Sequence, residues 1–152
     1  MENIRPFNAH SPILGENVFI ADTALVIGQV SIDVESSIWF HSVLRGDINA
    51  ITIGQRTNIQ DHCVLNVDHG TNPVEIGNEV TVGHRAVIHG CSIESQSLIG
   101  MSATVLSGAR IGSGSVIAAG TVVRENQQIP PGVLAAGVPA TVKREVTDEE
   151  FD

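Results

Sequence analysis

Two histidines, His84 and His89, are the side chains of this chain best suited to hold a metal ion. Imidazole is a good zinc ligand, and a catalytic zinc site combines three protein ligands with one open position for water. Further polar residues stand out from an aliphatic background ahead of this pair. They are Arg45, Asp47, Asn58, Gln60, Asp61 and Asn66. The sequence therefore contains parts of a metal site, provided that the fold brings them together.

A period of six residues predicts the elements that must position these side chains. Runs such as Ile20, Val26 and Ile32 place a branched aliphatic at every sixth position, and a smaller side chain follows four residues after each. An α-helix would need apolar spacings of three and four, and a hairpin sheet would need simple alternation. Two inward positions per repeat instead predict an all-β coil of short parallel strands, a hexapeptide-repeat solenoid. Residues 20–129 would give roughly six turns at about 4.8 Å per turn.

We expect a single β-helix domain over residues 1–152. The regular coil should cover about residues 12–129, because the Pro-Pro-Gly sequence at 130–132 interrupts the pattern. Residues 130–152 should form a C-terminal extension. Within it, residues 147–150 have the T-x-x-E form of a helix capping box, so a short helix should start there.

Two insertions and one deletion interrupt the period. Three extra residues should bulge out around 47–50, and about five near 69–73 should form an external loop. The step from Ile88 to Ile93 is one residue short. Such loops leave the inward stack untouched, and functional residues tend to collect in loops.

Polar residues align on successive turns once these interruptions are taken into account. Arg45, Asn66 and His89 each follow an inward aliphatic by one position, so they should form an outward column with a step of about 4.8 Å. Asp61 and His84 should form a second column across the corner. Columns on different faces of one coil do not point at one spot, but they can meet when three coils pack through a heterologous, ring-closing interface. The pattern predicts a homotrimer that could hold a metal at the seam between chains.

Three motifs carry a resemblance to a known family. R-G-D at 45–47, N-x-Q-D at 58–61 and G-H-x-x-x-x-H-G at 83–90 resemble those of the γ-class carbonic anhydrases and their bacterial relatives, over residues 10–146. The resemblance implies a left-handed parallel β-helix and a homotrimer. It also implies a zinc ion in each cleft between subunits, with CO2 or bicarbonate as the small-molecule substrate.

The resemblance assigns the metal ligands. His84 and His89 match two of the family's three ligand histidines, and Gln60 matches the glutamine that holds the metal-bound water or the substrate. Asn66 stands at the position of the remaining ligand histidine. A neutral amide oxygen is a weak zinc ligand. We therefore expect a weak site with two histidines, a site rescued by His69 from the following loop, or a lost site.

The resemblance also assigns the residues around the metal. Arg45 and Asp47 match an ion pair at the trimer seam, while Asn58 and Asp61 match the other polar residues of the N-x-Q-D motif. Ile48 stands where well-studied members carry an acid that helps to move protons.

Three functions fit these features. The first is a zinc-dependent lyase that hydrates CO2, with Gln60 orienting the metal-bound hydroxide and His69 as a candidate proton shuttle. Its activity should be weak or absent because of Asn66. The second is a catalytically silent trimer, either a scaffold or a bicarbonate-binding module. The third is a hexapeptide acyltransferase that uses CoA, which the short loops of this chain argue against.

Composition excludes several partners. The formal net charge of −9 argues against nucleic acid or an anionic membrane as a partner. The sequence contains no run of about eighteen apolar residues, so no transmembrane helix is expected. Cys63 and Cys91 are expected to be reduced, with Cys63 at an inward position, which fits a cytoplasmic protein.

Overall fold

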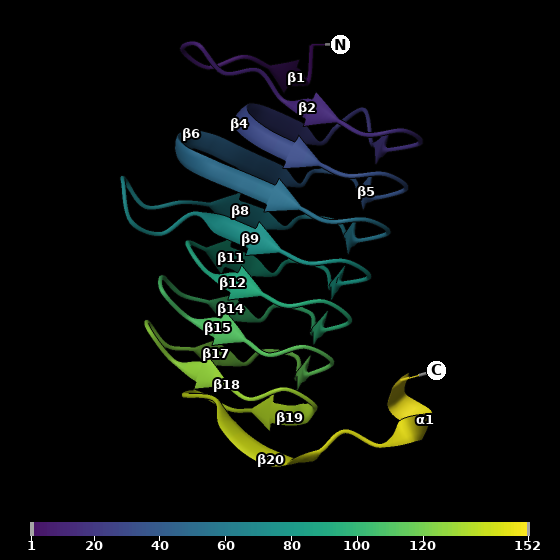
Figure 1. Cartoon of the computed structure of the whole chain (residues 1–152), viewed down its shortest axis with the longest axis vertical. Coiled ribbons are helices and arrows are strands. Elements are labelled where there is room, and N and C mark those ends of the chain that lie inside the picture. The colour runs from purple at the N-terminus through teal and green to yellow at the C-terminus, as the bar shows by residue number, and fades with distance from the viewer. Residues whose placement is uncertain (1, 152) are drawn as a thin grey trace.

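The computed structural model describes residues 2–151, and in it the chain winds into a parallel β-solenoid (Figure 1). The solenoid has about seven turns rather than the expected six, because strands at Ile4–Arg5 and Val133–Ala136 extend it beyond both predicted ends. The inward aliphatic residues of successive turns lie in register: Leu44 pairs with Leu65, and Leu65 pairs with Ile88. All three side chains are fully buried. The six-residue period is thus confirmed as the pattern of inward positions, and the predicted coil of parallel strands forms.

The strands lie on three faces, which the chain visits in the same order in each turn. The first face contains β1 (Ile4–Arg5), β8 (Val64–Asn66), β11 (Val87–His89), β14 (Thr104–Val105) and β17 (Val122–Val123). The second face contains β2 (Ile13–Leu14), β9 (Val74–Ile76), β12 (Ser92–Ile93), β15 (Arg110–Ile111) and β18 (Gln128–Ile129). The third face contains β3 (Phe19–Ile20), β5 (Ser37–Ile38), β7 (Asn58–Ile59), β10 (Thr81–Val82), β13 (Leu98–Ile99) and β16 (Val116–Ile117).

Two long strands connect the first face to the second. They are β4 (Leu25–Ile32) and β6 (Val43–Ile53), and the expected bulge at 47–50 is part of β6 rather than an external loop. β4 pairs with β6 on both sides of a register shift between Gly28 and Val30, so both strands pass the corner together. The second insertion does form a loop, between β8 and β9. There the Asn49 side-chain amide of β6 donates to the Asp68 carbonyl at 3.0 Å, so the two insertions touch.

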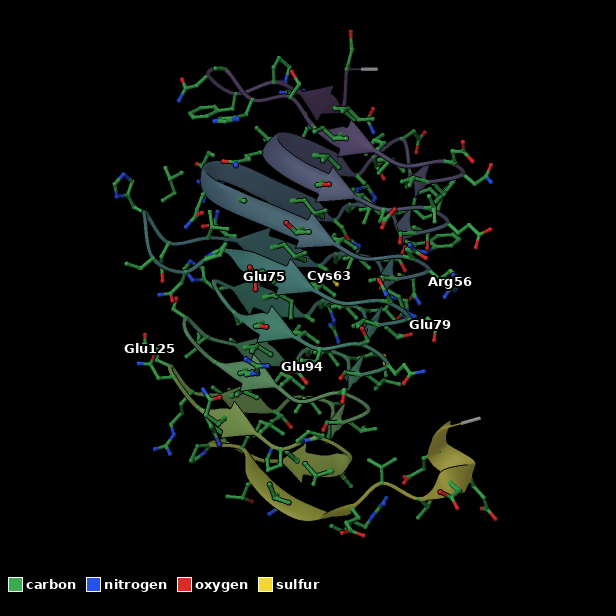
Figure 2. The ribbon with its side chains drawn as sticks, in the orientation of Figure 1. Arg56, Cys63, Glu75, Glu79, Glu94 and Glu125 are labelled. Carbon is green, nitrogen blue, oxygen red and sulfur yellow. The ribbon has the colours of Figure 1, made fainter. Side chains whose placement is uncertain are left out.

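Small inward side chains occupy the corners of the coil. The buried Ser42 hydroxyl donates to the Gln60 carbonyl at 2.6 Å and accepts from the Cys63 amide at 3.0 Å. Cys63 fills the same corner one turn later, inside the coil (Figure 2), where its sulfur lies 3.1 Å from the Gly83 carbonyl. Cys63 and Cys91 are both buried free thiols. The interior thus anchors the backbone of Gln60, a predicted site residue.

The coil continues one strand beyond the interruption at 130–132. β19 (Val133–Ala136) pairs parallel with β16, and β20 (Thr141–Glu145) then folds back antiparallel on β19. The short helix α1 (Asp148–Phe151) follows, and Glu150 accepts from the Thr147 amide at 2.9 Å as the capping box predicts. Within residues 2–151, no helix combines the length and the apolar character that a membrane span requires.

Candidate functional site

Four of the predicted site residues come together beside the third face. Asn58 lies in β7, Gln60 and Asp61 follow that strand directly, and His84 occupies the corresponding corner one turn later. They share an open hollow of about 430 Å³. Its lining residues are Ser37, Trp39, Asn58, Gln60, Asp61 and His84. The fold therefore assembles one part of the predicted site within a single chain.

His84 is held through one ring nitrogen. An Asp61 carboxylate oxygen lies 2.8 Å from His84 Nδ1. An ionised carboxylate can only accept, so Nδ1 carries the proton in this contact and Nε2 is the nitrogen left for a ligand. Neither His84 Nε2 nor the Gln60 side-chain amide makes a hydrogen bond within residues 2–151. Both groups line the hollow with unused hydrogen-bonding capacity.

Asn66 and His89 lie next to each other on the first face. They are register partners of β8 and β11, as the predicted column requires. The Asn66 amide is already engaged: its Oδ1 accepts from Arg45 Nη2 at 3.2 Å, and its Nδ2 donates to the Arg45 carbonyl at 3.0 Å. Arg45 also pairs with Asp47, whose other oxygen accepts from the Ile48 amide at 2.9 Å. The Arg45–Asp47 pair therefore forms within one chain, and Asn66 is tied to it.

His89 is held on its Nδ1 side as well. Nδ1 lies 2.9 Å from the Ser107 hydroxyl oxygen and 3.7 Å from a carboxylate oxygen of Asp68. The Ser107 hydroxyl and the Asn72 amide, which donates to Asp68 at 3.0 Å, lower the pKa of the Asp68 carboxyl below its usual value. Nε2 of His89 has no hydrogen-bond partner in the described part of the chain.

Four other histidines of the sequence, including the exposed His10, lie outside these contacts. His69 is exposed in the loop between β8 and β9, three residues after Asn66. His41 and His62 stack on each other at a corner, with ring centroids 5.0 Å apart. That stacking pairs these two imidazoles with one another rather than with His84 or His89.

The donor set of one chain is incomplete for zinc. Over residues 2–151, no three His, Cys, Asp or Glu side chains lie close enough together to hold an ion. His84 and His89 fit a zinc ligand's requirements, because each has an oxygen partner at Nδ1 and a free Nε2. Asn66 does not fit, because its amide is bound to Arg45 and an amide oxygen is a poor donor for zinc.

Three side chains near the predicted site had no role in the sequence analysis. Trp39 lines the hollow, and its indole N–H donates to the Ser37 hydroxyl at 3.0 Å. Asp68 and Ser107 contact His89. Two features of the sequence pointed to Asp68 and Ser107: an acid near the start of the loop between β8 and β9, and a polar residue about one turn beyond His89. Neither feature follows from the six-residue period.

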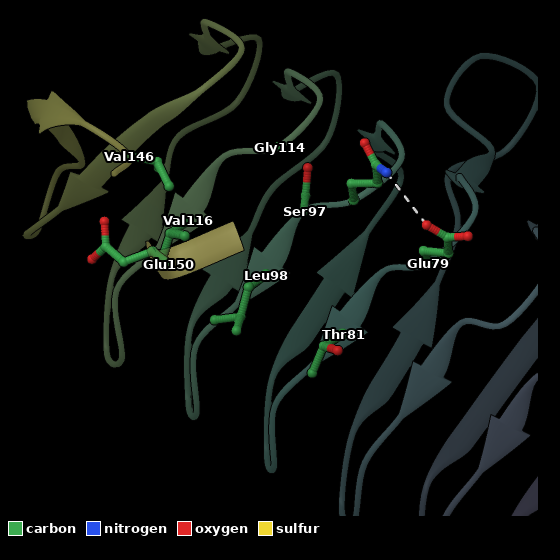
Figure 3. Close-up of a pocket in the computed structure, with 9 residues that line it drawn as sticks. Glu79, Thr81, Ser97, Leu98, Gly114, Val116, Val146 and Glu150 are labelled. Atoms are coloured by element: carbon green, nitrogen blue, oxygen red, sulfur yellow. Dashed lines mark hydrogen bonds between the residues drawn. The ribbon is translucent and has the colours of Figure 1, made fainter. Parts of the chain in front are cut away.

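A second hollow lies away from these residues. It encloses about 280 Å³ beside the C-terminal segment and is shown in Figure 3. Its lining includes Glu79, Leu98, Val146 and Glu150, and at one end of it Gln96 donates to Glu79 at 3.3 Å. None of the predicted site residues lines this hollow.

Comparison with known proteins places the chain in a family. Residues 90–125 match the family model described as bacterial transferase hexapeptide (six repeats). A probable carbonic anhydrase of Methanocaldococcus jannaschii is 48% identical, over 91% of this chain and 87% of that protein. The chain belongs to the gamma carbonic anhydrase-like family of hexapeptide-repeat proteins. This confirms the resemblance carried by the three motifs.

Two further relatives show how far the similarity extends. Gamma carbonic anhydrase 2, mitochondrial, of Arabidopsis thaliana is 46% identical over 93% of this chain, but the match covers 52% of that protein. The chain thus spans about half the length of that curated relative. A Bacillus cereus crystal structure, described as that of a candidate acetyltransferase, has a TM-score of 0.95 and 42% identity. It matches 97% of this chain and 86% of its own.

Proposed function

We propose that this protein is a homotrimer that binds zinc weakly at each seam between subunits, and that its CO2 hydration is slow or absent. In this arrangement His89 of one chain and His84 of a neighbouring chain approach the same ion. The observation that carries the proposal is the Asn66 amide, which stands beside His89 and is hydrogen-bonded to Arg45. A third imidazole is missing at that position.

The outward residues of the three faces support a trimer. The second face presents a polar column made of Ser31, Thr52, Glu75, Ser92, Arg110 and Gln128. The first face instead presents Val43, Val64, Val87, Thr104 and Val122. The third face exposes Phe19 and Leu98, each more than 40% accessible. Two partly apolar faces and one polar face suit coils that use two different faces for neighbours, as a heterologous ring requires.

The side chains of the site support a role in handling water or a small carbonyl compound. A zinc ion, when bound, supplies a Lewis acid that lowers the pKa of its water to about 7. The Gln60 amide offers a donor and an acceptor beside His84, with its backbone held from inside by Ser42. We assign Gln60 to orienting the water or substrate and exposed His69 to exchanging protons with solvent. Trimeric assembly belongs to the same proposal. So does a cytoplasmic location, which the two free thiols support.

A catalytically silent trimer is the second candidate, and the Arg45–Asn66 contact favours it. Arg45 keeps about half of its side chain exposed while it binds Asn66, so a guanidinium faces the position that a third metal ligand would occupy. Such a seam could bind bicarbonate without turning it over. Because the Bacillus cereus relative is described as an acetyltransferase, the experiment must also be able to detect acyl transfer.

The test measures zinc content and CO2 hydration in the wild-type protein, Asn66→His and Asn66→Ala. We expect little zinc and slow hydration in the wild type, and a joint rise in both for Asn66→His. Asn66→Ala is the matched control, because it releases Arg45 without adding an imidazole, and it should gain neither property. A wild-type protein with one zinc per subunit and a hydration rate equal to that of Asn66→His would refute the proposal. Acetyl-CoA binding by a metal-free wild type would favour acyl transfer instead.

A further inference from the structure

Ser107 and Asp68 both contact the imidazole of His89, although neither is among the proposed metal ligands. Both approach the same ring nitrogen, His89 Nδ1, at 2.9 Å and 3.7 Å respectively. Ser107 comes from the corner after β14, and Asp68 comes from the loop between β8 and β9. Parts of the chain that are far apart in sequence thus converge behind one imidazole.

We propose that Ser107 and Asp68 are positioning residues, which fix the His89 ring with its proton on Nδ1 and present Nε2 to the metal. This inference rests on the proposed function, because it assumes that His89 is a ligand. Partners of this kind typically change metal affinity by about 10–100-fold when they are removed.

The hydrogen-bonding groups of His89, Ser107 and Asp68 determine which of them donates and which accepts. A serine hydroxyl has one proton to give, and an ionised carboxylate accepts more strongly than a neutral imidazole nitrogen. The Ser107 hydroxyl is the main cause of the lowered pKa of the Asp68 carboxyl, so we assign the hydroxyl proton to Asp68. The hydroxyl oxygen then has a lone pair free for a proton on His89 Nδ1. The chain of contacts runs from imidazole to hydroxyl to carboxylate.

The two insertions hold Asp68 in this position, one through its carboxylate and the other through its backbone carbonyl. The Asn72 side chain donates to Asp68 Oδ2 at 3.0 Å, and the Asn49 side chain donates to the Asp68 carbonyl at 3.0 Å. Asn49 belongs to the first insertion, and Asn72 belongs to the second. The departures from the six-residue period therefore supply the contacts that hold Asp68 near His89.

A hydrolytic triad is excluded by the geometry. In a triad, the serine contacts one ring nitrogen and the carboxylate holds the other, so that the imidazole stands between them. Here the Ser107 oxygen and the Asp68 oxygen approach the same nitrogen. His89 therefore cannot pass a proton from Ser107 to Asp68 through its ring, and Ser107 is not an activated nucleophile.

The first measurement is the tautomer of His89 in the metal-free protein, read from ¹⁵N chemical shifts of labelled imidazoles at about pH 8.5, above the usual titration range of histidine. We expect the Nδ1–H tautomer in the wild type and a shift toward a mixture in Ser107→Ala and Asp68→Asn. Ser107→Thr keeps the hydroxyl and should restore the wild-type signal. Ser92→Ala, on the second face, is the matched control and should leave His89 unchanged.

The second measurement is zinc affinity in the Asn66→His background, by competition with a chromophoric chelator. Ser107→Ala should weaken binding by about 10–100-fold relative to that background, and Ser92→Ala should not. An Nε2–H tautomer in the wild type, or a tautomer indifferent to both Ser107→Ala and Asp68→Asn, would overturn the proposal. If the tautomers behave as expected but no variant binds zinc, the proposed function fails while the orienting role of Ser107 and Asp68 stands.

Discussion

Ile88 is the side chain through which core packing and site geometry can be tested together. It is fully buried, it lies in register between Leu65 and Val105, and it directly precedes His89. Ile88→Ala should destabilise the coil and loosen the backbone that carries His89. In a solenoid each turn contacts mainly its neighbours, so the damage should centre on the turns that contain Leu65 and Val105.

The magnitude follows from what the substitution removes. Ile88→Ala deletes three buried side-chain carbons, and at about 0.8 kcal/mol per buried carbon the transfer cost is about 2.4 kcal/mol. The cavity that remains adds to this, because backbones held in a continuous ladder can close it only in part, so we expect about 3–4 kcal/mol in total. Ile88→Val removes one carbon and should cost about 1 kcal/mol.

The assay is urea unfolding at matched protein concentration, followed by far-UV circular dichroism. A loss of about 3 kcal/mol with a slope of about 1–3 kcal/mol per molar urea should lower the midpoint by roughly 1–3 M. Ile13→Ala is the matched control, because Ile13 is 69% exposed on the polar second face and its loss should change the stability by less than about 0.5 kcal/mol. The reasoning is refuted if Ile88→Ala costs less than 1 kcal/mol, or if the two alanine variants are equally destabilised.

Further outcomes test the seam, the interior and the C-terminal segment. Arg45→Ala should raise the dissociation constant of the trimer by at least about tenfold, a change of about 1.4 kcal/mol, while the circular dichroism spectrum stays that of the coil. Light scattering on dilution would measure this, and an unchanged trimer would count against a seam role. Burial raises the pKa of the Cys63 thiol to about 11, so alkylation of Cys63 at pH 8 should be much slower in the native protein than in urea. Mass spectrometry would measure the two rates, and equally fast labelling of Cys63 under both conditions would show that it does not point inward. The Arg144 guanidinium lowers the pKa of Glu150 to about 2. The pair should therefore stabilise the C-terminal segment fully at pH values above the usual carboxyl pKa, and this stabilisation should be lost as the pH falls toward 2. NMR titration of Glu150 would detect this, and an unshifted carboxyl in the wild type or the same low pKa in Arg144→Gln would contradict the pairing.

The fold could be predicted from the sequence because its rule is local and repeated. Each turn buries a branched aliphatic and a small residue at fixed offsets, so the period alone places Leu44, Leu65 and Ile88 in one stack. Parallel pairing then carries the neighbouring outward residues with it. For this reason the Asn66–His89 pair could be expected before any coordinates.

The insertions were harder to interpret, because a break in a periodic pattern says where extra residues enter but not what they do. The first insertion continues β6 instead of leaving the coil, since β4 shifts register beside it. The interruption at 130–132 does not end the coil either, because β19 still pairs with β16.

What the sequence determined by itself is the solenoid, its register and the place of Asn66 among the motif residues. What only the tertiary structure decided is how the polar side chains are used. Asn66 bonds to Arg45, and Ser107 joins Asp68 behind His89, through contacts between outward groups on different turns. Such contacts depend on loop conformation and side-chain rotamers, which no periodic burial pattern specifies. Burial is a property that each residue type carries along the chain, whereas a hydrogen bond needs two particular atoms brought to about 3 Å in space.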